Sequence, residues 1–162
     1  MKYGFQALGL KANDVIVLPE YICDVVLHPL DQLGIKYKFF RQDKALAPKW
    51  EIMDSLVDTQ TKAIMLVHYF GQPQDIAKFQ KFCKIHNLLL IEDNAHGYGG
   101  TPNGQPLGSF GAMGFSSPRK QLQSASGGVL YLHGSPVEPK QNELPDYTIS
   151  KSKELLRNMI RP

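Results

Sequence analysis

A short apolar run that ends in two carboxylates constrains the fold of this chain more than any other stretch. Residues 88–91 read Leu-Leu-Leu-Ile and are followed directly by Glu92 and Asp93. An uninterrupted apolar run of this length is typical of a strand that is buried on both faces, as in parallel sheets covered by helices. Ligands of open α/β sheets bind at the carboxyl ends of the strands, so we expect Asp93 to lie at a binding site.

The rest of the chain repeats the alternation of strand and helix. Pro19 ends the first predicted strand, and Gly34 terminates the helix that follows it. Two strands joined through a helix run parallel in one sheet. Strands are predicted at residues 14–19, 35–40, 63–68, 88–93, 112–116 and 129–132, and helices at 5–10, 20–33, 50–57 and 74–86. We therefore expect an α/β protein of three layers, with helices on both faces of a mostly parallel sheet.

The helix predicted at residues 74–86 is the clearest amphipathic segment. Its lysines are interpreted as a solvated face, and its apolar residues are expected to face the sheet. These apolar residues are Ile76, Phe79, Phe82, Cys83 and Ile85. His68, at the end of the strand before this helix, has a structural role as its simpler interpretation.

Length and composition favour one ordinary globular unit. The chain has 162 residues, is 43% hydrophobic and carries a net charge of +3 from basic residues that are scattered along it. Scattered charge does not favour nucleic-acid binding or attachment to an anionic membrane. The two cysteines have no metal or redox spacing, and no apolar run approaches the ~18 residues of a membrane span. We therefore expect a cytoplasmic protein with reduced thiols.

Reactive residue types are concentrated after the predicted strand that ends at Asp93. They are His96, Ser116, Ser117 and Lys120. Such a set suits pyridoxal phosphate, because a lysine amine can form a Schiff base with its aldehyde and a carboxylate can hold its pyridine nitrogen protonated. Serine hydroxyls near the lysine would bind the phosphate. These residue types are common, and a surface lysine and a loop carboxylate are the structural alternatives when each is taken alone.

Five short motifs together give a more specific indication. They are Val-His-Tyr-Phe-Gly-Gln-Pro at 67–73, Ile-Glu-Asp-Asn-Ala-His at 91–96, Gly-Ser-Phe-Gly at 108–111, Ser-Pro-Arg-Lys at 117–120 and Ser-Gly-Gly at 126–128. In this order they resemble the DegT/DnrJ/StrS family of pyridoxal-phosphate-dependent sugar aminotransferases, over roughly residues 5–132. The resemblance implies the large domain of a fold type I pyridoxal-phosphate enzyme.

The resemblance also assigns roles to single residues. Lys120 would be the catalytic Schiff-base lysine, Asp93 the partner of the pyridine nitrogen, and His96, where many relatives have Gln, the neighbour of the phenolic oxygen. Ser116 and Ser117 both lie where a phosphate-binding hydroxyl is expected, and the register between them stays open. Many relatives stack an aromatic ring on the cofactor from the position of Cys23, for which a small buried thiol is the structural alternative.

The family pattern predicts transamination, in which an amino donor supplies nitrogen to a nucleotide-linked keto sugar for polysaccharide or antibiotic sugar biosynthesis. Related dehydratases often replace the lysine with His, so Lys120 favours transamination. Family members are generally homodimers with shared sites. No metal site and no nucleic-acid or membrane partner is expected.

Compared with the family pattern, the chain is expected to be truncated at both ends. Residues 1–135 would form the core of the cofactor-binding domain, residues 136–149 a linker, and residues 150–162 the start of a helix leading to an absent carboxyl-terminal domain. The alternative function is therefore a catalytically inactive remnant that serves as a structural or interaction domain.

Overall fold

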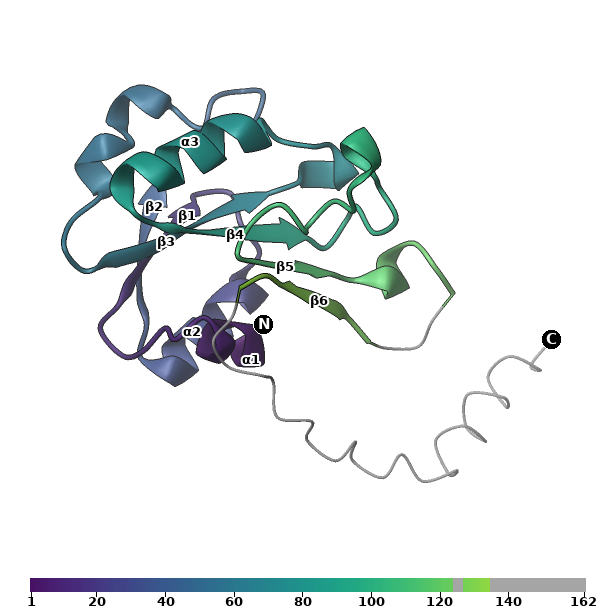
Figure 1. Cartoon of the computed structure of the whole chain (residues 1–162), viewed down its shortest axis with the longest axis horizontal. Helices are drawn as coiled ribbons and strands as arrows, with labels where there is room; N and C mark the ends of the chain where they lie inside the picture. Colours follow the sequence, from purple (N-terminus) through teal and green to yellow (C-terminus); the bar gives the residue numbers. More distant parts are fainter. Residues whose placement is uncertain (124–126, 135–162) are drawn as a thin grey trace.

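Six strands form a single sheet in the structure, a computed structural model that describes residues 1–123 and 127–134 (Figure 1). Their order across the sheet is β2-β1-β3-β4-β5-β6. The strands are β1 (Val15–Pro19), β2 (Lys36–Phe40), β3 (Thr61–Val67), β4 (Leu89–Asn94), β5 (Met113–Ser116) and β6 (Val129–Leu132). Neighbouring strands are parallel from β2 through β5, and β6 is antiparallel to β5. The predicted mostly parallel sheet is confirmed.

Helices cover both faces of this sheet. The helices α1 (Lys2–Ala7) and α2 (Leu27–Leu33) lie on one face, and α3 (Ile76–His86) lies on the other (Figure 1). Short 3-10 turns connect the elements: η1 (Asp24–Val26), η2 (Trp50–Ile52), η3 (Asp54–Leu56), η4 (Tyr69–Gly71), η5 (Pro102–Gly104) and η6 (Pro118–Lys120). The predicted three-layer arrangement is confirmed.

Each face of the sheet has its own apolar core, because successive side chains of a strand point to opposite faces. Ala63 and Met65 of β3 pack in the core beneath α1 and α2. Ile64 and Leu66 of the same strand pack in the core that contains Phe79, Phe82 and Cys83 of α3. Burial on both faces explains why the central strands read as continuous apolar runs.

Several local predictions differ from the structure. The first helix spans Lys2–Ala7 instead of residues 5–10, and only Leu27–Leu33 of the helix predicted at 20–33 is α-helical. Ile85 was expected to face the sheet but is 67% exposed. It follows Phe79 by six residues, roughly 240° around a helix, and therefore points away from the core. Residues 50–57 form the two turns η2 and η3 instead of one helix. Gly34 does end α2 in the left-handed conformation, with φ of 67°, as its sequence position predicts.

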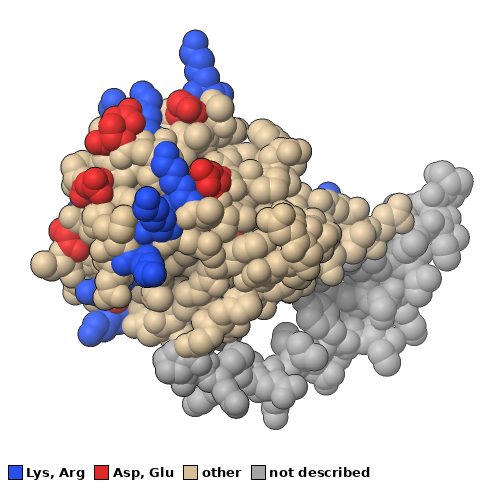
Figure 2. All heavy atoms as spheres, turned by 45° about the horizontal axis from the view of Figure 1, so that its top comes forward, with Lys and Arg blue, Asp and Glu red and all other residues tan. Residues whose placement is uncertain are grey.

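The surface carries charges of both signs. Figure 2 shows Lys and Arg interspersed with Asp and Glu on one face of the molecule. Within the part of the chain that the structure describes, no helix combines the length and the apolar character needed to cross a bilayer. The predicted linker at 136–149 and the predicted helix at 150–162 lie outside the described residues.

Candidate functional site

A cavity of about 700 Å³ opens at the carboxyl edge of the sheet. Residues at or just after the carboxyl ends of β1, β3, β4 and β5 line it, together with residues of α1 and β6. The chain passes from β1 to β2 on one side and then to β3 on the other, so the cavity lies at the strand-order reversal where α/β sheets bind ligands. All five predicted site residues line this one cavity: Asp93, His96, Ser116, Ser117 and Lys120.

Asp93 provides a buried carboxylate at the cavity. It is the penultimate residue of β4 and is 6% exposed, and its Oδ1 accepts a hydrogen bond from the Ala95 N–H at 2.9 Å. Burial raises the pKa of Asp93 above its ordinary value, while the Ala95 N–H and the positive charge of Lys120 act in the opposite direction. A cationic group bound beside Asp93 would therefore offset the cost of burying its charge.

Lys120 and His96 are in direct contact. Nζ of Lys120 lies 3.0 Å from Nε2 of His96. An ammonium can only donate, so Nε2 accepts this hydrogen bond and the neutral imidazole carries its proton on Nδ1. The side-chain amide of Gln121 donates to the main-chain oxygen of His96 at 2.8 Å. The lysine that follows β5 is thus joined to the loop that follows β4.

The two candidate serines differ in their surroundings. Ser116 ends β5 and is 3% exposed, and its Oγ accepts a hydrogen bond from Nδ2 of Asn94 at 3.0 Å. That bond leaves the hydroxyl hydrogen of Ser116 for another acceptor. Ser117 is half-buried and immediately precedes η6. Both positions can therefore present a hydroxyl to an anion in the cavity.

Tyr69 is hydrogen-bonded to the segment after β1, which forms one wall of the cavity. Its phenol donates to the main-chain oxygen of Tyr21 at 2.6 Å and accepts from Nε2 of Gln42 at 2.9 Å. Burial raises the pKa of Tyr69 to about 12, so the phenol stays protonated and remains a donor. Cys23 on the same wall is exposed, and its Sγ lies 3.6 Å from Oδ1 of Asp24. The structural alternative of a buried thiol at Cys23 is therefore wrong.

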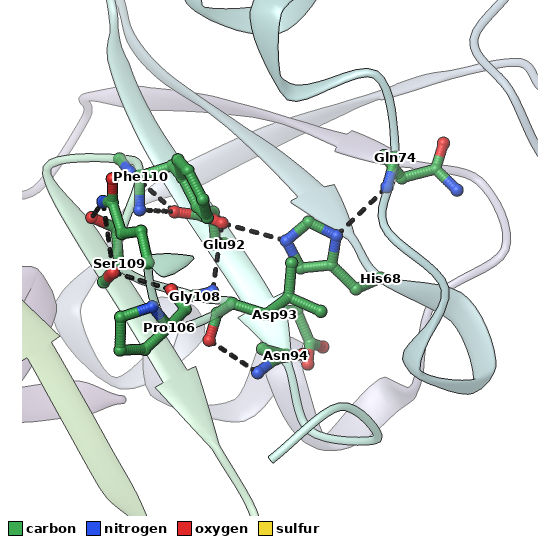
Figure 3. Close-up of polar contacts among 12 residues, drawn as sticks. His68, Gln74, Glu92, Asp93, Asn94, Pro106, Gly108, Ser109 and Phe110 are labelled. Carbon is green, nitrogen blue, oxygen red and sulfur yellow. Dashed lines mark hydrogen bonds and ion pairs between the residues drawn. The ribbon is translucent and has the colours of Figure 1, made fainter. Parts of the chain in front are cut away.

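Glu92, the carboxylate just before Asp93 in β4, has a partner that was not predicted from the sequence. Glu92 and His68 are both fully buried, and Oε2 of Glu92 lies 2.9 Å from Nε2 of His68 (Figure 3). Nδ1 of His68 accepts from the main-chain N–H of Gln74 at 3.2 Å. The imidazole proton therefore sits on Nε2 and is donated to Glu92. The structural role predicted for His68 agrees with this pairing.

Glu92 also binds the loop between β4 and β5. Its Oε1 accepts from the main-chain N–H groups of Phe110 and Gly111, each at 2.6 Å, and its Oε2 accepts from that of Gly108 at 3.2 Å (Figure 3). With His68, four donors surround one buried carboxylate. The Gly-Ser-Phe-Gly motif thus folds around Glu92. A carboxylate inside an apolar strand was the available signal, since such a group needs buried partners.

Comparisons with known proteins show which family this chain is similar to. The model of the DegT/DnrJ/EryC1/StrS aminotransferase family matches residues 1–158. The GDP-perosamine synthase of Vibrio cholerae is 27% identical over 160 residues, which are 97% of this chain and 44% of that protein. The GDP-4-keto-6-deoxy-D-mannose 3-dehydratase of Escherichia coli O55:H7 is 34% identical over 110 residues, which are 67% of this chain and 28% of that protein.

A solved structure shares the fold. The E. coli GDP-4-keto-6-deoxy-D-mannose-3-dehydratase with bound hydrated pyridoxal phosphate aligns with a TM-score of 0.72 at 28% identity. The match covers 81% of this chain and 36% of that one. The chain therefore spans less than half the length of these similar proteins. By its sequence match and its fold, the chain belongs to the DegT/DnrJ/EryC1/StrS aminotransferase family.

Proposed function

We propose that the chain is the pyridoxal-phosphate-binding core of an aminotransferase that acts on a nucleotide-linked keto sugar in polysaccharide or antibiotic sugar biosynthesis. The observation that carries this proposal is the convergence of Asp93 and Lys120 on one cavity. Asp93 lies in β4 and Lys120 in η6, the turn that follows β5, yet both line the same space.

The residues at the cavity fit the chemical groups of pyridoxal phosphate. The buried carboxylate of Asp93 would hold the protonated pyridine nitrogen, and that positive charge would oppose the burial effect that raises the pKa of Asp93. The amine of Lys120 would bind the aldehyde carbon, and His96 would contact the phenolic oxygen. Ser116 and Ser117 would donate to the phosphate. A volume of about 700 Å³ suits a cofactor together with part of a substrate.

The bound cofactor would supply an electron sink for a substrate carbanion. The chain's own residues would handle the proton. Nζ of Lys120, once released from the cofactor, would remove a proton from the substrate carbon and return it as general acid. Nε2 of His96, 3.0 Å from Nζ in the structure, would orient the amine by hydrogen bonding.

Transamination is preferred to dehydration because Lys120 occupies the position of the proton-transferring lysine. Amino nitrogen would come from a small-molecule donor and pass to the sugar. We further propose that the whole protein is a cytoplasmic homodimer, as the resemblance to intact family members implies.

Titration of the full chain with pyridoxal phosphate, followed by the absorbance of the cofactor, tests the proposal. We expect saturable binding that is lost in Lys120→Ala and weakened in Asp93→Ala. Lys81→Ala, which removes an exposed lysine on α3, should bind as the unsubstituted chain does. A folded chain that does not bind would contradict the proposal and favour the structural or interaction domain.

A further inference from the structure

Phe70 combines a strained backbone with an exposed ring at the cavity. Its φ and ψ are 55° and 23°, in the left-handed region that a bulky residue rarely adopts. Of the five described non-glycine residues with positive φ, three are asparagines, and only Phe70 and Leu46 are not. The Phe70 side chain is 72% exposed and lines the cavity, so its own burial does not explain the strain. Strain of this kind commonly persists where a site needs one geometry.

The strained turn brings the Phe70 ring onto His96. The two rings are nearly parallel, with 6° between their planes and 6.1 Å between their centroids. Gly71 also has a positive φ, of 77°, and packs against the next loop so tightly that a Cβ there would lie 2.9 Å from the main-chain oxygen of His96. Two successive left-handed residues therefore place η4 directly against His96.

The same imidazole also contacts the amine of Lys120. Nε2 of His96 lies 3.0 Å from Nζ, while Gln121 holds the main-chain oxygen of His96. His96 itself is exposed, so packing within the core does not fix its ring. The Phe70 ring lies parallel to the His96 ring in an offset stack.

We propose that Phe70 is a positioning residue for Lys120, acting through His96. Its ring restricts the rotation of the imidazole and so keeps Nε2 directed at the lysine amine. Phe70 would have this role in the cofactor-free chain. Only the effect of the role on cofactor binding rests on the proposed function. Tyr21 and Tyr69 line the cavity too, but their rings pack on each other with centroids 5.7 Å apart.

The substitution Phe70→Asn separates positioning from a structural role. Asparagine adopts the left-handed conformation readily, so it relieves the backbone strain while it removes the ring. A residue that only supports the fold should lower the melting temperature when truncated. We expect the melting temperature of F70N to equal or exceed that of the unsubstituted chain, while the contact between His96 and Lys120 is lost.

Nuclear Overhauser contacts between the His96 ring and the Lys120 side chain, measured in the cofactor-free full chain, provide the direct readout. We expect them in the unsubstituted chain and in Phe70→Tyr, which keeps the ring, and not in F70N. Phe39→Asn, which removes an exposed ring on β2, serves as the matched control and should retain them. Trapping of pyridoxal phosphate on Lys120 with borohydride should be roughly tenfold slower in F70N, because orientation of the amine is lost.

Persistence of the contact between His96 and Lys120 in F70N would overturn the proposal. If F70N does not fold, Phe70→Leu is compared with Phe70→Tyr instead. Contacts between His96 and Lys120 of the same strength in these two variants would also overturn the proposal. Absence of cofactor trapping in every variant, together with loss of the contact in F70N alone, would contradict the proposed function and support the positioning role.

Discussion

Glu92 and His68 form a fully buried pair, with Oε2 of Glu92 2.9 Å from Nε2 of His68. The pair ties the end of β3 to β4 one residue before Asp93. The main-chain N–H of His68 also donates to the main-chain oxygen of Asp93 at 2.9 Å. The position of the cavity carboxylate therefore depends on a hydrogen-bond network on the opposite face of the same strand.

Glu92→Gln should destabilise the chain strongly. The four donors around Glu92 suit two carboxylate oxygens, and an amide group would turn its own N–H groups toward two of those donors. We expect a loss of about 2 kcal/mol in the free energy of unfolding, measured by urea denaturation. Glu20→Gln, at an exposed glutamate, is the control and should change it by less than about 0.5 kcal/mol. An equally small effect of E92Q would show that the network contributes little.

Asp93→Asn should stabilise the cofactor-free chain at neutral pH. Because burial raises the pKa of Asp93, its contribution to stability is fully present below the ordinary pKa of 3.8 and is lost as pH rises through the raised value. The asparagine remains neutral and can still accept from the Ala95 N–H. Melting temperatures between pH 3 and 7 should therefore show an advantage of D93N that disappears toward the acid end.

Asp31→Asn provides the matched control, since it removes one negative charge from an exposed position on α2. It should not reproduce the pH-dependent advantage of D93N. A D93N chain that is less stable than the unsubstituted chain at pH 7 would contradict the claim that burial of the charged Asp93 carboxylate destabilises the cofactor-free chain.

The two cysteines should differ sharply in reactivity. Cys83 is buried in the core beneath α3, and burial raises its pKa to about 12, so little thiolate is present at neutral pH. Cys23 is exposed and lines the cavity. We expect iodoacetamide to modify Cys23 alone in the folded chain and both thiols in urea, with peptide mass spectrometry as the measurement.

Pyridoxal phosphate should protect Cys23 from this alkylation, because the cofactor and the thiol would share the cavity. Inorganic phosphate at the same concentration is the control for a simple anion effect. Modification of Cys23 at an unchanged rate in saturating cofactor would place the bound cofactor elsewhere.

The sequence allowed prediction of the strands and of their carboxyl ends because burial on both faces leaves long apolar runs. It also allowed prediction of five of the cavity residues, since Asp93 lies at the end of β4 and Lys120 follows β5, the neighbouring parallel strand. The partners of Glu92 could not be predicted, because its loop donors come from residues 16 to 19 positions later and their geometry depends on how that loop folds. The left-handed backbone conformation of Phe70 could not be predicted either, because no local sequence pattern indicates that conformation for an aromatic residue.

Reduction of the complex with pyridoxal phosphate, followed by peptide mass spectrometry, tests the central claim most directly. Borohydride reduction would fix the cofactor on whichever amine holds it. We predict label on Lys120 in the unsubstituted chain and label on Lys120 at the same level in Lys81→Ala. In Lys120→Ala we predict no label on any of the remaining lysines. Label spread over surface lysines, unchanged by the substitution of Lys120, would contradict the assignment of this cavity as the cofactor site.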